Sequence, residues 1–226
     1  MGGLGAPKPP ITTLSPMGLS IEVLIADAAW LGEVPLPERL SRLRDAWYAD
    51  ETGLWDLDAG AAQSVEGDWQ WPQGPDSAYF GVYAFRRTLG SYKPHFWAGE
   101  RWEDVRDHAD PVLRAALDAL LLGLIWCGPD GEDEHTDPGV FGDGPAVSNG
   151  VLLARAPDSV RRLAATWERL RPRLGGLRAA FTAHAATPQE GGWISSFDEF
   201  TDLLEDWGRV LTEADRRGWC VVGLKD

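Results

Sequence analysis

The chain has little of the chemistry by which most enzyme families are recognised. Its 226 residues include only two cysteines and four histidines. Cys127 and Cys220 lie far apart and form no C-x-x-C pair, which argues against a disulfide framework or a thiolate zinc site. The motifs G-x-S-x-G, H-E-x-x-H, G-x-x-x-x-G-K-[ST] and G-x-G-x-x-G are absent. Hydrolase, zinc-protease, P-loop and dinucleotide-binding activities therefore lack their usual signatures.

Long apolar runs and basic clusters are also missing. The longest apolar run, residues 119–128, is about half the length that a spanning helix needs. The first residues, MGGLGAPKPPITTLSPMG, show neither a cationic segment nor an apolar one, so we expect no export and a cytoplasmic protein. The formal net charge is −14 and the basic residues are spread singly. We therefore expect neither a membrane nor a nucleic acid as partner.

Apolar side chains, by contrast, are plentiful. They make up 44% of the residues, and twelve residues are tryptophan, so burial can stabilise a core without cross-links. Residues 1–17 are rich in proline and glycine and show no periodicity, which predicts a flexible or strap-like tail. We expect residues 18–226 to form a single domain with an acidic loop at 128–144.

The periodicity of the apolar residues indicates mostly helices. The spacing predicts helices over residues 37–47, 76–89, 111–124, 157–170, 174–184 and 196–217, the last with a capping box formed by Ser196 and Glu199. Residues 19–25 are rich in β-branched residues and predict a strand, and residues 219–224 predict a terminal strand that can pair with it. Residues 150–154 fit either a strand or the lead into a helix. The fold class predicted is α+β: a helix-dominated single domain with a small sheet that pairs the N-terminal and C-terminal strands.

The C-terminal third resembles a known family. Its pattern is a helix containing Val160 and Leu163, an alanine- and arginine-rich connector, and the ending SFDEFTDLLEDWGRVLTEADRRGWCVVGLKD. This ending is similar to that of the YfbM-like family of bacterial proteins, which are small α+β domains. The positions that match the family pattern are Phe197, Leu204, Ala214, Gly218, Val221 and Val222. The resemblance implies a fold and no catalytic residue.

The acidic loop at 128–144, GPDGEDEHTDPGVFGDG, raises the question of a metal site. It carries six carboxylates and no lysine or arginine. A calcium loop beginning at Asp130 would need glycine where His135 stands, so the EF-hand pattern fails. Runs of like charge are usually solvated, and we predict a hydrated loop with no metal and no cofactor. The glycines and prolines predict irregular structure here and through the adjoining GDGPAVSNG.

Reactive and aromatic residues are densest in residues 92–108. A pocket wall built from this segment would offer Tyr92, Trp97 and Trp102 as ligand contacts, with His95 and Asp104 as an acid–base pair. The alternative is that Trp97 and Trp102 fill the flank of the core.

Further tryptophans come from the acidic stretch that precedes this segment. Trp55, Trp69 and Trp71 would join the ligand-binding set if they lined the same cleft. Neither cysteine is expected to pair with a histidine, because a cysteine at a helix end or inside a strand is ordinarily a packing residue.

Three hypotheses about function follow from the sequence. The first is a non-enzymatic interaction protein whose acidic, tryptophan-rich surface binds a basic protein, in the manner of an inhibitor or immunity protein. The second is a small-molecule-binding protein or enzyme with a tryptophan-lined pocket around residues 92–108. The third is a scaffold that forms oligomers.

Overall fold

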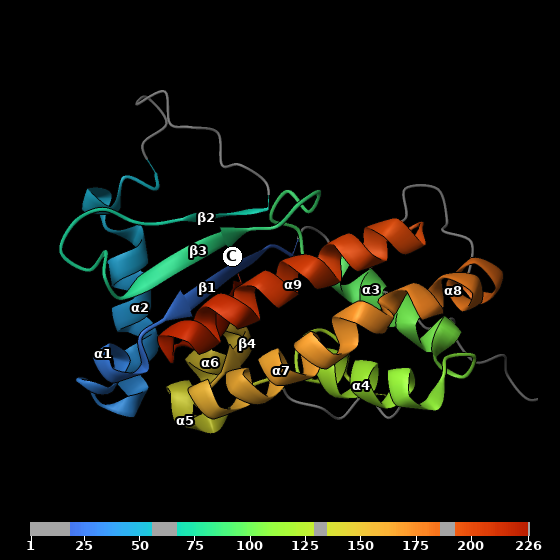
Figure 1. Cartoon of the computed structure of the whole chain (residues 1–226). Coiled ribbons are helices and arrows are strands. Elements are labelled where there is room, and N and C mark those ends of the chain that lie inside the picture. Colours follow the sequence, from blue (N-terminus) through green and yellow to red (C-terminus); the bar gives the residue numbers. More distant parts are fainter. Residues whose placement is uncertain (1–18, 56–66, 129–134, 186–192, 226) are drawn as a thin grey trace, which may run out of the picture.

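The structure, a computed structural model, describes residues 19–55, 67–128, 135–185 and 193–225 (Figure 1). The predicted tail at 1–17 and the centre of the acidic loop lie outside the described residues. No described helix combines the length and the apolar character that crossing a membrane requires.

One antiparallel sheet of five strands, in the order β2-β3-β1-β5-β4, organises the domain. The strands are β1 (Ile21–Ala26), β2 (Asp68–Gln70), β3 (Phe80–Ala84), β4 (Val151–Arg155) and β5 (Cys220–Lys225). β1 pairs with β5 along its whole length, from Ile21 opposite Lys225 to Ala26 opposite Cys220. The chain is therefore an α+β domain with a small sheet that joins its N-terminal and C-terminal strands, which confirms the fold class predicted from the sequence.

Nine α-helices within the described residues surround this sheet. They are α1 (Ala28–Gly32), α2 (Arg39–Tyr48), α3 (Lys93–Arg106), α4 (Pro111–Leu122), α5 (Pro138–Phe141), α6 (Pro145–Gly150), α7 (Pro157–Leu170), α8 (Arg178–His184) and α9 (Phe197–Arg217). Three short 3₁₀ helices, Leu36–Glu38, Asp50–Thr52 and Arg171–Leu177, precede or follow α2 and α7.

The two faces of the sheet belong to two separate cores. Successive side chains of β1 point to opposite faces: Val23 and Ile25 face α7 and α9, whereas Leu24 and Ala26 face α1 and α2. Both sets are buried, and this explains why β1 is an almost continuous apolar run. In Figure 1, α1 and α2 lie at one end of the molecule and α3, α4 and α8 at the other.

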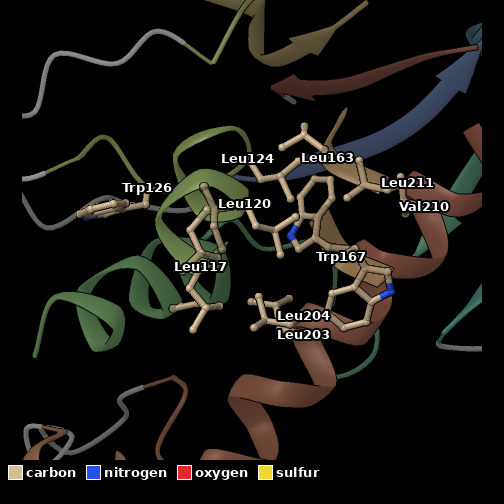
Figure 2. Packing of buried hydrophobic residues seen from close by; sticks show 14 of the residues in the cluster. Leu117, Leu120, Leu124, Trp126, Leu163, Trp167, Leu203, Leu204, Val210 and Leu211 are labelled. Atoms are coloured by element: carbon tan, nitrogen blue, oxygen red, sulfur yellow. The ribbon is translucent and has the colours of Figure 1, made fainter. Parts of the chain in front are cut away.

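The larger core lies where α4, α7 and α9 meet. Leu117 and Leu120 of α4 lie near Trp167 of α7 and the leucines of α9 (Figure 2). Gly208 of α9 allows a close approach of the two helices, because a Cβ there would lie 2.1 Å from Cε2 of Trp167. Both ends of α9 are capped as predicted. Ser196 and Glu199 form a capping box at its start, and Gly218 ends it with a φ of 69°.

The helix predicted at 76–89 is wrong, because the chain forms β3 there. This strand pairs with β1 on one side, from Phe80 to Tyr83, and with β2 on the other, from Val82 to Ala84. A short apolar run that is buried on both faces carries no periodicity by which a strand differs from a helix. β1 pairs with β5 along one edge, and its other edge would be left with unpaired backbone N–H and C=O groups. β3 forms because it pairs with these groups.

Irregular structure was also predicted around the end of the acidic loop, and the described part of that region corrects it. Residues 138–141 form α5 and residues 145–150 form α6, each with proline in the first turn. Val140, Phe141 and Val147 are buried against α2 and the sheet. Residues 151–155, for which a strand and a helix lead were both considered, form the edge strand β4.

Candidate functional site

The residue pair considered for acid–base chemistry lies on α3. His95 is completely buried and accepts a hydrogen bond at Nδ1 from Nε1 of Trp207, at 3.2 Å. Burial lowers the pKa of His95 to about 3, so the ring is neutral at neutral pH. His95 and Asp104 are nine residues apart, about two and a half helical turns, and so project from opposite faces of α3. The helix therefore does not bring them together as an acid–base pair.

The two tryptophans of α3 pack rather than line a cleft. Trp102 is fully buried and donates a hydrogen bond from Nε1 to Oδ1 of Asp118, at 3.0 Å. Trp97 is partly buried, and the guanidinium of Arg101 lies over its ring. Arg101 also forms an ion pair with Asp104, at 3.1 Å.

Tyr92 stands next to the start of α3. Its ring stacks against that of His95, with centroids 6.1 Å apart. Burial and the charge of Cys127 raise the pKa of Tyr92 to about 12.

Trp69, on the edge strand β2, and Trp71, just after it, form a second group. Their rings stack with centroids 5.2 Å apart. Trp71 lies against Gly81 of β3, where a Cβ would come within 2.5 Å of the indole. The guanidinium of Arg217 lies between the rings of Trp71 and Trp219, at 4.2 Å and 4.7 Å. The protein's own cation thus already occupies an aromatic surface of this group.

A hollow beside this group opens between β2, α7 and α9, and its charges are mixed. It is lined by carboxylates and arginines together, among them Asp68, Glu205, Glu213, Arg171 and Arg209. Several of these groups pair within the protein: Glu213 binds both Arg216 and Arg217, and its pKa is lowered to about 2 mainly by the hydrogen bond from Arg216.

Beneath this hollow a buried polar network joins α9 to β3. The fully buried carboxylate of Asp206 accepts hydrogen bonds from the hydroxyl of Tyr83, at 3.1 Å, and from Nε of Arg86, at 2.8 Å. Burial and the neighbouring Asp206 raise the pKa of Tyr83. Because these groups satisfy one another, we assign the network to stability.

Trp55 belongs to a third group, on the other face of the sheet. Trp47, Tyr48 and Trp55 form an aromatic triad with ring centroids between 4.4 and 5.3 Å apart. Trp47 is buried, whereas Tyr48 is 47% and Trp55 44% exposed. The indole of Trp55 is held in place because Nε1 donates to the carbonyl oxygen of Trp47, at 2.8 Å.

A hollow lies beside this triad. Its walls combine apolar and aromatic residues with polar ones. The apolar and aromatic part includes Trp47, Leu54, Trp55, Val82, Phe85 and Leu89, and the polar part includes Gln70, Thr88 and the carboxylate of Glu22. Leu89 is 85% exposed and has a φ of 50°, a left-handed conformation that costs a non-glycine residue about 1–2 kcal/mol. The fold therefore keeps a large apolar side chain in solvent at the margin of the hollow, with the backbone in a strained conformation.

The sequence around the triad is acidic. Residues 45–85 contain no lysine, arginine or histidine. Asp45, Asp50 and Glu51 are exposed on and just after α2. An aromatic surface with carboxylates around it can bind a cationic side chain through cation–π attraction and charge. We call the triad, Leu89 and these exposed carboxylates the acidic aromatic surface.

The structure thus distributes the candidate residues over three places. The first place is α3 and the residue before it, the second is β2 and the residue after it, and the third is the segment that follows α2. They hold, in this order, Tyr92, His95, Trp97, Trp102 and Asp104; Trp69 and Trp71; and Trp55. Sequence reasoning missed Tyr48, Glu22 and Leu89. Tyr48 offered one signal, because it lies next to the apolar stripe of a predicted helix and has a tryptophan seven residues further on.

The described residues contain no group of three or more histidine, cysteine, aspartate or glutamate side chains that could hold a metal ion. Most carboxylates of the acidic loop, at 130–134, lie outside the described residues.

No family model, curated protein or solved structure matches the chain. The similarity of the C-terminal third to the YfbM-like family therefore stays a prediction from the sequence.

Proposed function

We propose that this protein is a non-enzymatic cytoplasmic interaction protein that binds a basic protein partner through its acidic aromatic surface. The observation that carries the proposal is the aromatic triad. Two of its three rings are about half exposed, although they are held by stacking and by a hydrogen bond to the backbone.

Rigid, half-exposed aromatic residues are suited to protein interfaces. Tryptophan and tyrosine are enriched among the residues that contribute most binding energy. Residues that are ordered before binding lose little conformational entropy when the complex forms. Tyr48 and Trp55 meet both conditions, because each stacks on the other and on the buried Trp47.

Charge favours a basic partner. The net charge of −14 attracts cations at long range, and the exposed Asp45, Asp50 and Glu51 lie within three residues of Tyr48 in the sequence. A lysine or arginine of the partner would stack on Trp55 and have its charge balanced by the carboxylates. An inhibitor or immunity protein of a basic toxin would bind in this way; the comparison rests on the combination of acidic and aromatic residues and on no sequence similarity.

The other parts of the proposal rest on composition. The two cysteines, both among the described residues, are not joined in a disulfide, and this suits the reducing cytoplasm. The excess of acidic residues disfavours nucleic acid and anionic membranes as partners. We propose no cofactor.

The alternative, a small-molecule pocket around residues 92–108, has less support. Across the five surface hollows described for the chain, Pro94 is the one lining residue from that segment. His95 and Trp102, the residues that would lie deepest in such a pocket, are fully buried.

A differential capture experiment tests the proposal. The wild-type chain, a Tyr48→Ala/Trp55→Ala variant and a Phe96→Ala control would be immobilised and exposed to lysate at low salt. Phe96 is 43% exposed but lies on α3, so it matches the variant in exposure and differs in position. We expect proteins of high isoelectric point to be retained by the wild type and the control, to be lost by the double variant, and to elute as salt is raised.

Two results would contradict the proposal. One is that the double variant retains the same proteins as the wild type, which would show that the triad takes no part. The other is that the proteins retained through the triad are acidic or elute independently of salt.

A further inference from the structure

Cys127 lies at the surface, where the sequence had suggested a packing residue. It follows the C-terminal turn of α4, and its side chain is exposed. Cys220, in contrast, lies on β5 inside the smaller core and is 3% exposed. The two cysteines of this chain therefore differ in their access to solvent, since one is exposed and the other buried.

A histidine stands beside the exposed thiol. The sulfur of Cys127 lies 3.7 Å from Nε2 of His135, within hydrogen-bonding distance for sulfur. His135 is only 9% exposed, so the imidazole lies on the buried side of the exposed thiol.

The backbone holds His135 in this position. Its carbonyl oxygen accepts the N–H of Ala154 of β4, at 2.8 Å, and Asp137 donates its own N–H back to the carbonyl of Ala154, at 2.7 Å. The carboxylate of Asp137 is fixed in turn by Arg155 and by the N–H of Ala156. Hydrogen bonds to the edge strand β4 thus hold in place the segment that contains His135.

We propose that Cys127 and His135 form a nucleophilic thiol site that reacts with low-molecular-weight disulfides. In this reaction Nε2 of His135 accepts the thiol proton, and the Cys127 thiolate attacks one sulfur of the disulfide. A new sulfur–sulfur bond forms to Cys127 as the old one breaks. The leaving thiolate then takes the proton from His135, so that Cys127 is oxidised and half of the disulfide is reduced.

The described residues supply what this exchange requires. Attack on a disulfide needs a thiolate, a nearby group that accepts its proton, and open access to the sulfur. Burial, with the charge of Cys127 as a second cause, raises the pKa of Tyr92 to about 12, so this tyrosine stays protonated at neutral pH.

The second cysteine is unsuited to resolve the product. Burial raises the pKa of Cys220 to about 12, and its thiol lies in the core. A mixed disulfide at Cys127 should therefore persist until an external thiol removes it. This proposal is independent of the binding surface around Trp55, since the two sites share no residue.

The test uses the full chain and oxidised glutathione as the probe. At neutral pH we expect one glutathione per chain by intact mass, located on Cys127 by peptide mapping, with Cys220 unmodified. Cys127→Ser should remove the adduct. His135→Asn should slow its formation by about tenfold or more, because no imidazole then stands beside the sulfur to accept the thiol proton. His184→Asn, on the exposed end of α8, serves as the matched histidine control and should react at the wild-type rate.

A pH–rate profile distinguishes activation from a structural effect. In the His135→Asn variant the rate should follow the ionisation of an ordinary thiol, whereas the wild type should retain most of its rate below that pH range. A comparison that needs no variant is the native chain against the same chain unfolded in urea, where we expect Cys127 to react about tenfold faster when folded. The proposal is overturned if native Cys127 reacts no faster than in urea, if the adduct forms on Cys220, or if His135→Asn has the wild-type rate and profile.

Discussion

The two faces of the sheet put the same kind of residue to different uses. On the face covered by α7 and α9, Trp102 and Trp207 are completely buried and donate their N–H groups to Asp118 and His95. On the face covered by α2, Trp47 is buried but Trp55 beside it is almost half exposed. The residues compared are tryptophans on both faces. What differs is the number of helix layers that cover each face of the sheet.

The lengths of the covering helices explain the difference. α9 has 21 residues, and α3, α4 and α8 pack around it and α7, so aromatic side chains there meet a second layer. α2 has 10 residues, and the end of the sheet beyond it is open at the hollow. We conclude that the first face is the more completely covered of the two, and the proposed function assigns binding to the second, a division that the following variants can test.

The largest expected effect is that of Trp207→Ala. It removes a fully buried indole and leaves Nδ1 of His95 without its donor. We expect the free energy of unfolding to fall by about 3–5 kcal/mol, as for other large-to-small changes of buried aromatic residues. Urea unfolding followed by tryptophan fluorescence measures it, and a loss below about 1 kcal/mol would show that this face is not the main source of stability.

Gly208→Ala should have the next largest effect. The change favours the helix by about 1 kcal/mol in propensity, but the new Cβ would lie 2.1 Å from Cε2 of Trp167. The clash forces α7 and α9 apart, and we expect a net loss of about 1–3 kcal/mol. Gly175→Ala is the matched control, because a Cβ there meets nothing within 4 Å. Equal stabilities of the two variants would argue against close contact between the helices.

The pH dependence of stability tests the burial of His95. Its pKa is about 3 when folded and about 6.5 when unfolded, so between these values the unfolded chain binds more protons. Stability should therefore fall as pH falls from about 6.5 towards 3, by up to about 1.4 kcal/mol per pH unit. His95→Gln should remove this part of the slope, and the exposed His108→Gln should keep it. Parallel curves for His95→Gln and the wild type would contradict the neutral, buried histidine.

Trp55→Ala should have the smallest effect on stability. The side chain is 44% exposed, and surface substitutions usually change the free energy of unfolding by about 0.5 kcal/mol. With the hydrogen bond to Trp47 also lost, we expect a decrease of less than about 1 kcal/mol by urea unfolding. A loss as large as that of Trp207→Ala would remove the distinction between the two faces.

Elements with strong local signals could be predicted from the sequence. α9 has a capping box at Ser196, a long apolar stripe and a glycine after its last turn, and each of these acts within a few residues. β5 follows directly and is rich in β-branched residues, so its pairing with β1 could be expected. β3 could not be predicted, because its identity depends on two partner strands distant in the sequence.

The candidate sites were harder to predict than the fold. The sequence singled out Trp55 within an acidic stretch, but it also grouped Trp55 with Trp69 and Trp71, which the fold places on the other face. It treated Cys127 as a packing residue, because the short distance to His135 arises only when the chain returns to the edge of β4.

The sequence by itself determined the composition of the core, the caps and stripes of the long helices, and the excess of acidic groups, because these depend on residue type and short spacing. The tertiary structure alone decided which aromatic rings are buried, which are left at the surface, and which thiol faces a histidine. The physical reason is that exposure depends on what covers a residue, and the covering elements here come from segments distant along the chain.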